Sequence, residues 1–464
     1  MRRTAEIFLF DADDYETLFA KYGINGIWTE EQLEQHKKVG KILDELGIKP
    51  SWFDDLNEIG ARREGLDHRR MSNNSIAFVE KPEEDFMDLV FEMMQMEGEP
   101  GFVNLAEASR RVLGSLGVEN PTKKQIKDKA YDLGLNPCVE IILHSKNVCN
   151  LTTINVRSFV KEDGTLDKDG IVRAQQLSTR IGLRMTLAEL ELPEWDKVQS
   201  RDRLLGVSMT GWKDAVDLLG YSQEQEDELK TLLHKTAREE ADLYSKQLRV
   251  NAPMFVTAVK PEGTLSQVAG GVSSGLHWAH SPYFKRRIRI NATDPLAQVA
   301  KELGWPIHAE VGTNNIMDED KLAEQEQLDA SRTWVVTFPV ESGASVTKDD
   351  ITIDDQFDNY FSFQDVYTEM NTSNTITVKP GEWKQAQKRV WEGWDNFVGV
   401  SFLSHDGGTY LLAPYEAIEK DEFEAIQKEM KPFNAELLLK YEESETELDL
   451  DLIESCSSGV CPIR

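Results

Sequence analysis

The chain has 464 residues, 40% of them hydrophobic, and its 82 acidic against 52 basic side chains give a formal net charge of −30. This length and composition indicate a folded protein with one large core or two to three domains. The acidic excess argues against a long nucleic-acid or anionic-membrane footprint, because such surfaces need net positive faces, whereas a small polyanion needs only a local cluster of donors.

No stretch reaches the roughly 18 to 20 uninterrupted apolar residues of a membrane span, and the N-terminal segment turns acidic too soon for a signal peptide. We therefore expect a cytoplasmic protein. Its four cysteines fall into two pairs, Cys138 with Cys149 and Cys456 with Cys461. The spacing of the first pair fits tetrahedral zinc poorly, so no metal site is expected, and a reducing compartment favours thiol chemistry over structural disulfides. For Cys149 alone, a buried apolar thiol is an open alternative.

Strand-like and helical patterns alternate from the N-terminus and predict an α/β core with parallel strands. The strand-like segments are 4–10, 74–79, 138–143, 152–156, 254–259, 333–340, 374–378 and 398–404. The helical segments are 28–47, with Thr29 and Gln32 as a capping box, and 83–97, 103–114, 123–133, 381–392 and 416–431. Residues 169–248 are almost wholly helical in pattern and predict a helical excursion.

Beyond about residue 440 the sequence turns to EESETELDLDLIES, followed by CSSGVCPIR. A run this acidic packs poorly, so it predicts a mobile arm that ends in a dithiol.

The densest group of chemically useful side chains is Leu135-Asn-Pro-Cys-Val-Glu-Ile141. Pro137 would fix a bend, and the period of two in a strand would place Cys138 and Glu140 on one face, with Asn136 just before them. We therefore expect an amide, a thiol and a carboxylate to converge on one pocket. From these residues alone, a strand end with a buried cysteine and a solvated glutamate is an equal alternative.

A second candidate site is Lys260-Pro-Glu-Gly-Thr-Leu-Ser266, a turn that leads into a predicted helix. Gly263 would permit close backbone approach, while Thr264 and Ser266 offer hydroxyl and N–H groups at a helix start, which suits an anion. Taken alone, the segment fits an ordinary turn into a capped helix better. The candidate phosphate-binding residues are Pro261, Glu262, Gly263, Thr264, Leu265 and Ser266.

The N-P-C-x-E-I segment, with a second cysteine eleven residues after the first and Asn150-Leu151-Thr152 behind it, resembles the active-site segment of ribonucleotide reductases. Its spacing resembles the class II, cobalamin-dependent branch, and within it the monomeric ribonucleoside-triphosphate reductases. Essentially the full chain shares this resemblance, at Arg2-Arg3-Thr4-Ala5, Met71-Ser-Asn-Asn-Ser75, Glu99-Pro-Gly-Phe102, the phosphate loop 260–266 and the terminal Cys-x4-Cys.

The resemblance implies the C-terminal part of a ten-stranded α/β barrel, of the kind shared with glycyl-radical enzymes. This catalytic domain would cover residues 1–435, with the helical excursion at about 168–250, and a flexible acidic tail with a redox dithiol would cover 436–464. The implied reaction converts ribonucleotides, triphosphates rather than diphosphates, to 2′-deoxyribonucleotides by thiyl-radical chemistry. Adenosylcobalamin would supply the radical, and thioredoxin or glutaredoxin the electrons.

Each residue of the active-site segment has a role that the resemblance implies. Cys138 would become the thiyl radical and abstract the 3′-hydrogen, Glu140 would act as general base toward the 3′-hydroxyl, and Asn136 would bind the ribose. Cys149 would be one half of the reducing dithiol, and the terminal cysteines would carry electrons to it by thiol–disulfide exchange. The segment 270–280 is a candidate for lining the nucleotide or cofactor pocket, with its histidines packed rather than bound to cobalt.

The family pattern is incomplete at one point. Relatives carry the partner of Cys149 in an early barrel strand, near the allosteric nucleotide region, and no cysteine precedes Cys138 here. We therefore expect one piece of a split enzyme, as a phage gene could encode, that needs a complementary N-terminal fragment. The alternatives are a class I large subunit, although Tyr410 and Tyr415 are not adjacent, and a non-catalytic remnant that acts as a binding protein.

Overall fold

The computed structural model describes residues 7–442 except 67, 70–72, 317 and 406–410. It divides into two compact units: unit 1 is Met1–Ala279 with Ala344–Asp406, and unit 2 is His280–Gly343 with Gly407–Arg464. The motif at residues 2–5, the first two residues of the motif at 71–75, and Cys456 and Cys461 lie outside the described residues. The predicted division into a domain over 1–435 and a tail over 436–464 stays a prediction.

The strands of unit 1 form one five-stranded sheet, ordered β1-β2-β3-β12-β11, and two pairs, β4-β5 and β6-β7. In the larger sheet β3 and β12 are antiparallel and the other neighbours are parallel, while β6 and β7 are parallel and β4 and β5 antiparallel. The strands are β1 (Ile7–Phe10), β2 (Asn73–Phe78), β3 (Gly101–Asn104), β4 (Leu133–Leu135), β5 (Ile142–His144), β6 (Asn150–Asn155), β7 (Leu205–Thr210), β11 (Thr375–Val378) and β12 (Gly399–Ser404).

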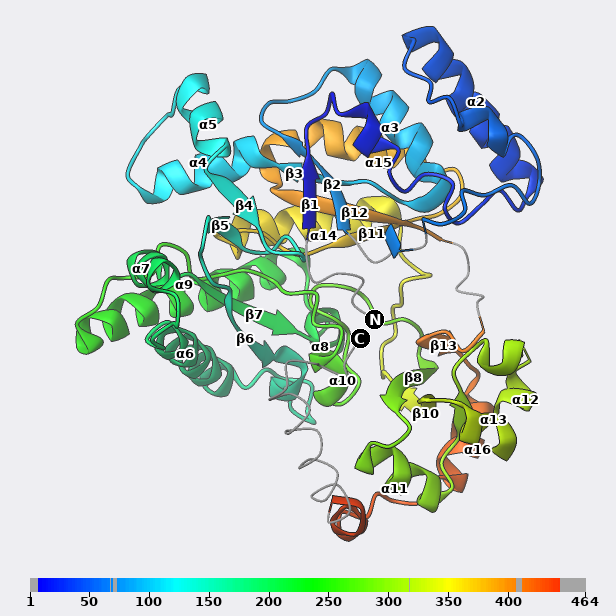
Figure 1. The fold of residues 1–464 in the computed structure, drawn as a ribbon. Helices are drawn as coiled ribbons and strands as arrows, with labels where there is room; N and C mark the ends of the chain where they lie inside the picture. Colours follow the sequence, from blue (N-terminus) through cyan, green and yellow to red (C-terminus); the bar gives the residue numbers. More distant parts are fainter. Residues whose placement is uncertain (1–6, 67, 70–72, 317, 406–410, 443–464) are drawn as a thin grey trace. The chain divides into compact units, whose positions relative to one another are not determined.

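Helices surround these sheets. They are α1 (Tyr15–Leu18), α2 (Glu30–Leu46), α3 (Glu84–Glu97), α4 (Leu105–Ser115), α5 (Lys123–Ala130), α6 (Lys168–Met185), α7 (Pro193–Asp202), α8 (Trp212–Leu219), α9 (Gln223–Leu248), α10 (Leu265–Val268), α14 (Ile353–Val366) and α15 (Trp383–Glu392). Helices α2, α3 and α15 gather on one side of the five-stranded sheet, whereas α6 packs on β6, β7 and α9 (Figure 1). The predicted α/β class is confirmed.

The helix boundaries follow local chemistry. The Thr29 hydroxyl oxygen accepts a hydrogen bond from the Gln32 backbone N–H, and the Gln32 side-chain oxygen accepts one from the Thr29 backbone N–H, so the predicted capping box at the start of α2 is confirmed. The helix ends at Gly47, which takes the left-handed conformation that glycine adopts at low cost.

The helical pattern expected over 169–248 is present as α6, α7, α8 and α9. It is interrupted by β7, a fully buried six-residue run that pairs with β6. A short apolar run buried on both faces shows no strand period, so its sequence cannot be told from that of a buried helix. The predicted strand over 254–259 is reduced to isolated bridges at Thr257 and Val259.

Unit 2 is built on an antiparallel sheet ordered β13-β8-β10-β9. Its strands are β8 (Tyr283–Asn291), β9 (Ile307–Ala309), β10 (Thr333–Glu341) and β13 (Tyr415–Ala417). Its helices are α11 (Pro295–Leu303), α12 (Glu319–Leu322), α13 (Gln325–Ala330) and α16 (Lys420–Glu429). The predicted strand over 333–340 is confirmed as β10, whereas the expected parallel pairing does not extend to this unit.

No helix among the described residues is suited to cross a lipid bilayer. In the part of the chain that the structure describes, every helix is too short or too polar to cross a membrane.

Candidate active site

Cys138 lies in the loop that joins β4 to β5 and not in a strand. The predicted strand over 138–143 is therefore wrong for residues 138–141, and strand alternation cannot be what relates Cys138 to Glu140. The bend expected at Pro137 is present, but the backbone turns back at Val139, whose φ is 66°. This left-handed conformation is rare for a β-branched residue, so the surrounding structure must hold it in place.

Asn136 closes this loop from inside. Its N–H donates to the carbonyl of Ile141 at 3.3 Å, and its side-chain Oδ1 accepts from the Ile141 N–H at 2.9 Å. Its own carbonyl accepts from the N–H of Val139 at 2.8 Å. The structure thus uses the Asn136 side-chain oxygen to shape the loop, while the predicted ribose contact stays a prediction.

The loop tip forms part of the wall of a cavity of about 360 Å³ in unit 1. Cys138 and Val139 line it together with Pro261 of the predicted phosphate loop. The rest of the wall comes from β2, the segment between α3 and β3, β3 itself, the approach to β11 with its first residue, and β12. These residues are Asn73, Ser75, Gly98, Glu99, Gly101, Phe102, Ser373, Asn374, Thr375, Gly399, Val400, Ser401, Phe402 and Leu403. This volume is in the range of small-ligand sites and suits a nucleoside-sized group.

Cys149 lies just before β6 and is partly buried. Burial, followed by the negative charges of Glu140 and Cys138, raises the pKa of its thiol to about 12. The Glu140 carboxyl is itself buried, so water screens its charge poorly at the Cys149 thiol. Of the predicted residues in the segment 136–149, only Cys138 lines the cavity, within the described part of the chain.

The raised pKa predicts that Cys149 resists alkylation. Because the thiolate is the nucleophile, at pH 8 iodoacetamide should modify Cys149 in the folded chain at least about a hundredfold more slowly than in the chain unfolded in urea. Peptide mass spectrometry over time measures both rates. Equal rates in the two states would contradict the described environment of this thiol.

The segment between β5 and Cys149 is anchored by the buried carboxylate of Asp202. His144 Nδ1 lies 2.9 Å from Asp202 Oδ2, the Asn147 amide donates to the same oxygen at 2.7 Å, and Arg201 Nε donates to Oδ1 at 2.6 Å. Burial alone would raise the pKa of Asp202, but the hydrogen bonds from Arg201 and His144 outweigh it and lower the pKa to about 2.

We expect this anchor to appear as pH-dependent stability. A lowered folded-state pKa contributes stability that is present above the unfolded pKa, near 4, and is lost as the pH falls toward 2. Asp202→Asn should cost about 2 kcal/mol of unfolding free energy at pH 7, and the difference from the parent chain should shrink between about pH 4 and pH 2. Urea unfolding at each pH measures it, and Asp132→Asn, at an exposed aspartate, is the control expected to change little.

The predicted phosphate loop is only partly directed toward the cavity. Pro261 lines the cavity, and Gly263, Thr264 and Leu265 are exposed, so their backbone can meet a ligand. The helix start is confirmed, because α10 begins at Leu265. Ser266, by contrast, is fully buried, with its hydroxyl 3.0 Å from that of Ser274.

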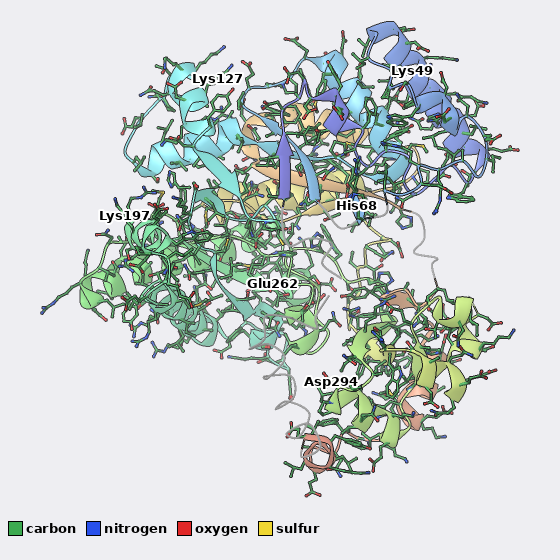
Figure 2. The ribbon with its side chains drawn as sticks, in the orientation of Figure 1. Lys49, His68, Lys127, Lys197, Glu262 and Asp294 are labelled. Atoms are coloured by element: carbon green, nitrogen blue, oxygen red, sulfur yellow. The ribbon has the colours of Figure 1, made fainter. Side chains whose placement is uncertain are left out.

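Glu262, and not its neighbour Gly263, takes the left-handed conformation, with a φ of 56°. Its side chain is 2% exposed and lies inside unit 1 (Figure 2). Its Oε1 accepts hydrogen bonds from Thr153 at 2.6 Å and Ser208 at 2.9 Å, and Lys260 Nζ lies 3.4 Å from Oε2. The Glu262 carboxylate therefore fixes the loop 260–266 to β6 and β7. At this residue only the backbone, and not the side chain, is suited to bind an anion.

Sequence reasoning missed several cavity residues. Asn73 and Ser75 stood in a recognised motif without a role, and the stretch Ser373-Asn-Thr375 was not singled out. The polar run at 371–375, which leads into the strand-like segment 374–378, was the sequence feature that could have indicated these cavity residues. His277 belongs to packing, as expected, because its Nδ1 lies 2.9 Å from the Ser274 carbonyl and its Nε2 accepts from the Thr375 N–H at 3.3 Å.

Known proteins are similar to this chain in sequence and in fold. Residues 59–241, which contain both Cys138 and Cys149, match the family model described as "Ribonucleotide reductase, barrel domain". An adenosylcobalamin-dependent ribonucleoside-triphosphate reductase of Lactobacillus acidophilus is 27% identical over 427 residues, which are 86% of this chain and 53% of that protein. The same-named protein of Levilactobacillus brevis is 27% identical over 430 residues, with the same coverage.

The solved structure of a B-12 dependent (class II) ribonucleotide reductase matches with a TM-score of 0.63 at 24% identity, over 81% of this chain and 52% of that one. Over residues 59–241 the chain is therefore similar to the barrel domain of ribonucleotide reductases. More narrowly, most of the chain is similar to about half the length of the adenosylcobalamin-dependent, class II ribonucleotide reductases, which confirms the resemblance drawn from its motifs. The chain spans about half the length of these relatives.

Proposed function

We propose that this chain is the catalytic C-terminal piece of a cytoplasmic, adenosylcobalamin-dependent ribonucleotide reductase. Its substrates would be ribonucleoside triphosphates and its products 2′-deoxyribonucleotides. The observation that carries the proposal is the position of Cys138, which lines a nucleoside-sized cavity together with Pro261 of the loop 260–266.

The reaction must break an unactivated C2′–O bond, and a radical at C3′ makes that bond labile. Cys138, as a thiyl radical, takes the 3′-hydrogen atom and becomes a thiol. Glu140 takes the proton of the 3′-hydroxyl and later returns it to the 3′-oxygen, and the 2′-hydroxyl leaves as water with a proton from the reducing dithiol. Cys138 then returns its hydrogen atom to C3′, so it is regenerated as a radical at the end of each turnover.

The two electrons of the reduction come from two thiols, which become a disulfide. A pKa of about 12 keeps the hydrogen on the sulfur of Cys149, and this form can deliver hydrogen to C2′. Residues 1–137 contain no cysteine that could supply the second thiol. We assign it to a complementary N-terminal reductase polypeptide, and we assign regeneration of the dithiol to Cys456, Cys461 and thioredoxin or glutaredoxin.

The cofactor fits this site in part. A cavity of about 360 Å³ has room for the adenosyl group and not for a corrin ring, which must then lie outside it. His277 is unsuited to ligate cobalt, because both of its ring nitrogens are engaged within the protein. Adenosylcobalamin would supply the initial radical by homolysis of its cobalt–carbon bond.

The test is product formation from labelled ribonucleoside triphosphates with adenosylcobalamin and dithiothreitol, with and without a complementary N-terminal reductase polypeptide. We expect deoxyribonucleotides only when both polypeptides are present. Turnover by the chain alone would contradict the need for a partner. Absence of product and of cobalamin binding in the reconstituted pair would contradict the reductase assignment.

A further inference from the structure

The two backbone carbonyls that flank Cys138 are each held by an asparagine side chain from a distant part of unit 1. The Asn73 amide donates to the carbonyl of Pro137 at 2.8 Å. The Asn371 amide donates to the carbonyl of Val139, also at 2.8 Å. Cys138 is thus bracketed by two hydrogen bonds that its own hairpin does not supply.

The hydrogen-bond roles around Asn371 are fixed by backbone groups at both ends. The Thr372 N–H donates to Gln364 Oε1 at 3.0 Å, so the Gln364 amide nitrogen is left to donate to Asn371 Oδ1 at 2.8 Å. The Asn371 nitrogen must therefore point at its two carbonyls, Val139 at 2.8 Å and Gly399 at 3.3 Å. Asn371 is fully buried, so water does not compete for these bonds.

The loop needs such external support. Val139 holds a left-handed φ of 66°, which its branched side chain disfavours. The loop also presses on β12, since a Cβ at Gly399 would lie 2.3 Å from Val139 Cγ1. The Tyr360 hydroxyl donates to the Gly399 carbonyl at 2.7 Å, and this bond holds the start of β12 in place.

We propose that Asn73 and Asn371 are positioning residues that clamp the loop and keep the Cys138 sulfur directed into the cavity. The inference rests on the proposed role of Cys138 as the hydrogen-abstracting thiol. Hydrogen transfer depends steeply on the distance and orientation of the reacting atoms, so a thiol on a tight loop needs the residues on both sides of it held in place. The clamp requires the asparagine N–H donors and no charge.

The clamp is tested by the reactivity of Cys138 in Asn371→Ala and Asn73→Ala. Each variant and the parent chain is treated with iodoacetamide at pH 8, and alkylation of the Cys138 and Cys149 peptides is followed by mass spectrometry. Each variant removes the hydrogen bond to one carbonyl beside Cys138, which should loosen the loop and speed alkylation of Cys138 at least about fivefold. Cys149 serves as the internal reference and should change by less than about twofold.

Asn359→Ala is the matched control. Asn359 is also a buried asparagine of unit 1 whose amide donates to a backbone carbonyl, that of Leu276 at 3.0 Å. It should leave the alkylation of Cys138 unchanged. Where Asn371→Ala fails to fold by circular dichroism, Asn73→Ala decides, since Asn73 is only half-buried and its loss is tolerated better.

Alkylation rates of Cys138 within about twofold of the parent chain in the folded variants would contradict the clamp. An equal increase in the alkylation rates of Cys138 and Cys149 would also contradict it, because it indicates general loosening of the fold. Alkylation needs no substrate, cofactor or turnover. If the reductase assay yields no product while alkylation of Cys138 alone is faster in the variants, the proposed function is contradicted and the clamp is still supported. In an active reconstituted enzyme, the two variants should lower kcat with little change in KM.

Discussion

Cys138→Ala is expected to abolish deoxyribonucleotide formation, with turnover reduced at least about a thousandfold in the reconstituted reductase. Alanine keeps the loop backbone and its hydrogen bonds to Asn73 and Asn371 but removes the sulfur at the cavity wall. The residue is only partly buried, so the fold should be retained. Product analysis by chromatography and circular dichroism measure the two effects.

Cys138→Ser should be equally inactive, since a hydroxyl holds its hydrogen too strongly to relay a radical. Ser145→Ala, at an exposed position beyond the other end of β5, is the control expected to retain activity. Appreciable turnover in Cys138→Ala would contradict the thiyl assignment and favour a binding role for the chain.

Phe102→Ala is expected to cause the largest loss of stability among single substitutions near the site, about 3 to 5 kcal/mol of unfolding free energy. The ring of Phe102 is almost fully buried and meets Phe78, Phe91 and Phe402 edge to face, with centroids 5.6, 5.5 and 5.8 Å away. Removing it leaves a hole behind β3 and β12, whose rigid aromatic neighbours cannot close it. Urea unfolding followed by tryptophan fluorescence measures the loss.

The matched control is Phe433→Ala, at a phenylalanine that is 46% exposed. It should cost less than about 1 kcal/mol, because little area is returned to water. Similar losses in the two variants would show that the aromatic cluster behind the cavity does not carry the stability assigned to it.

Features set by neighbours in sequence were predictable. The capping box of Thr29 and Gln32 and the helix start at residue 265 need only a few adjacent residues, and both are present. The cysteine, glutamate and asparagine of the active-site segment were identified by the resemblance of their motif to a known family, and of these Cys138 lines the cavity.

Features set by distant contacts were not predictable. The turn at Val139 depends on a hydrogen bond from Asn371 and on the close approach of Gly399. Neither contact can be predicted from the sequence around Val139. Strand β7 lacks a readable period because both of its faces are buried. The inward turn of Glu262 depends on Thr153 and Ser208, which are far away in the chain.

The clamp on Cys138 also has a consequence for biosynthesis. Its two hydrogen bonds join residues 64 and 232 positions apart in the chain, and contacts of such long range form late because the intervening chain must first be closed. During synthesis, Cys138 leaves the ribosome long before Asn371 does, so the loop cannot be held in its final shape on the nascent chain. The reactive thiol is thus expected to acquire its orientation only when nearly the whole of unit 1 has been translated.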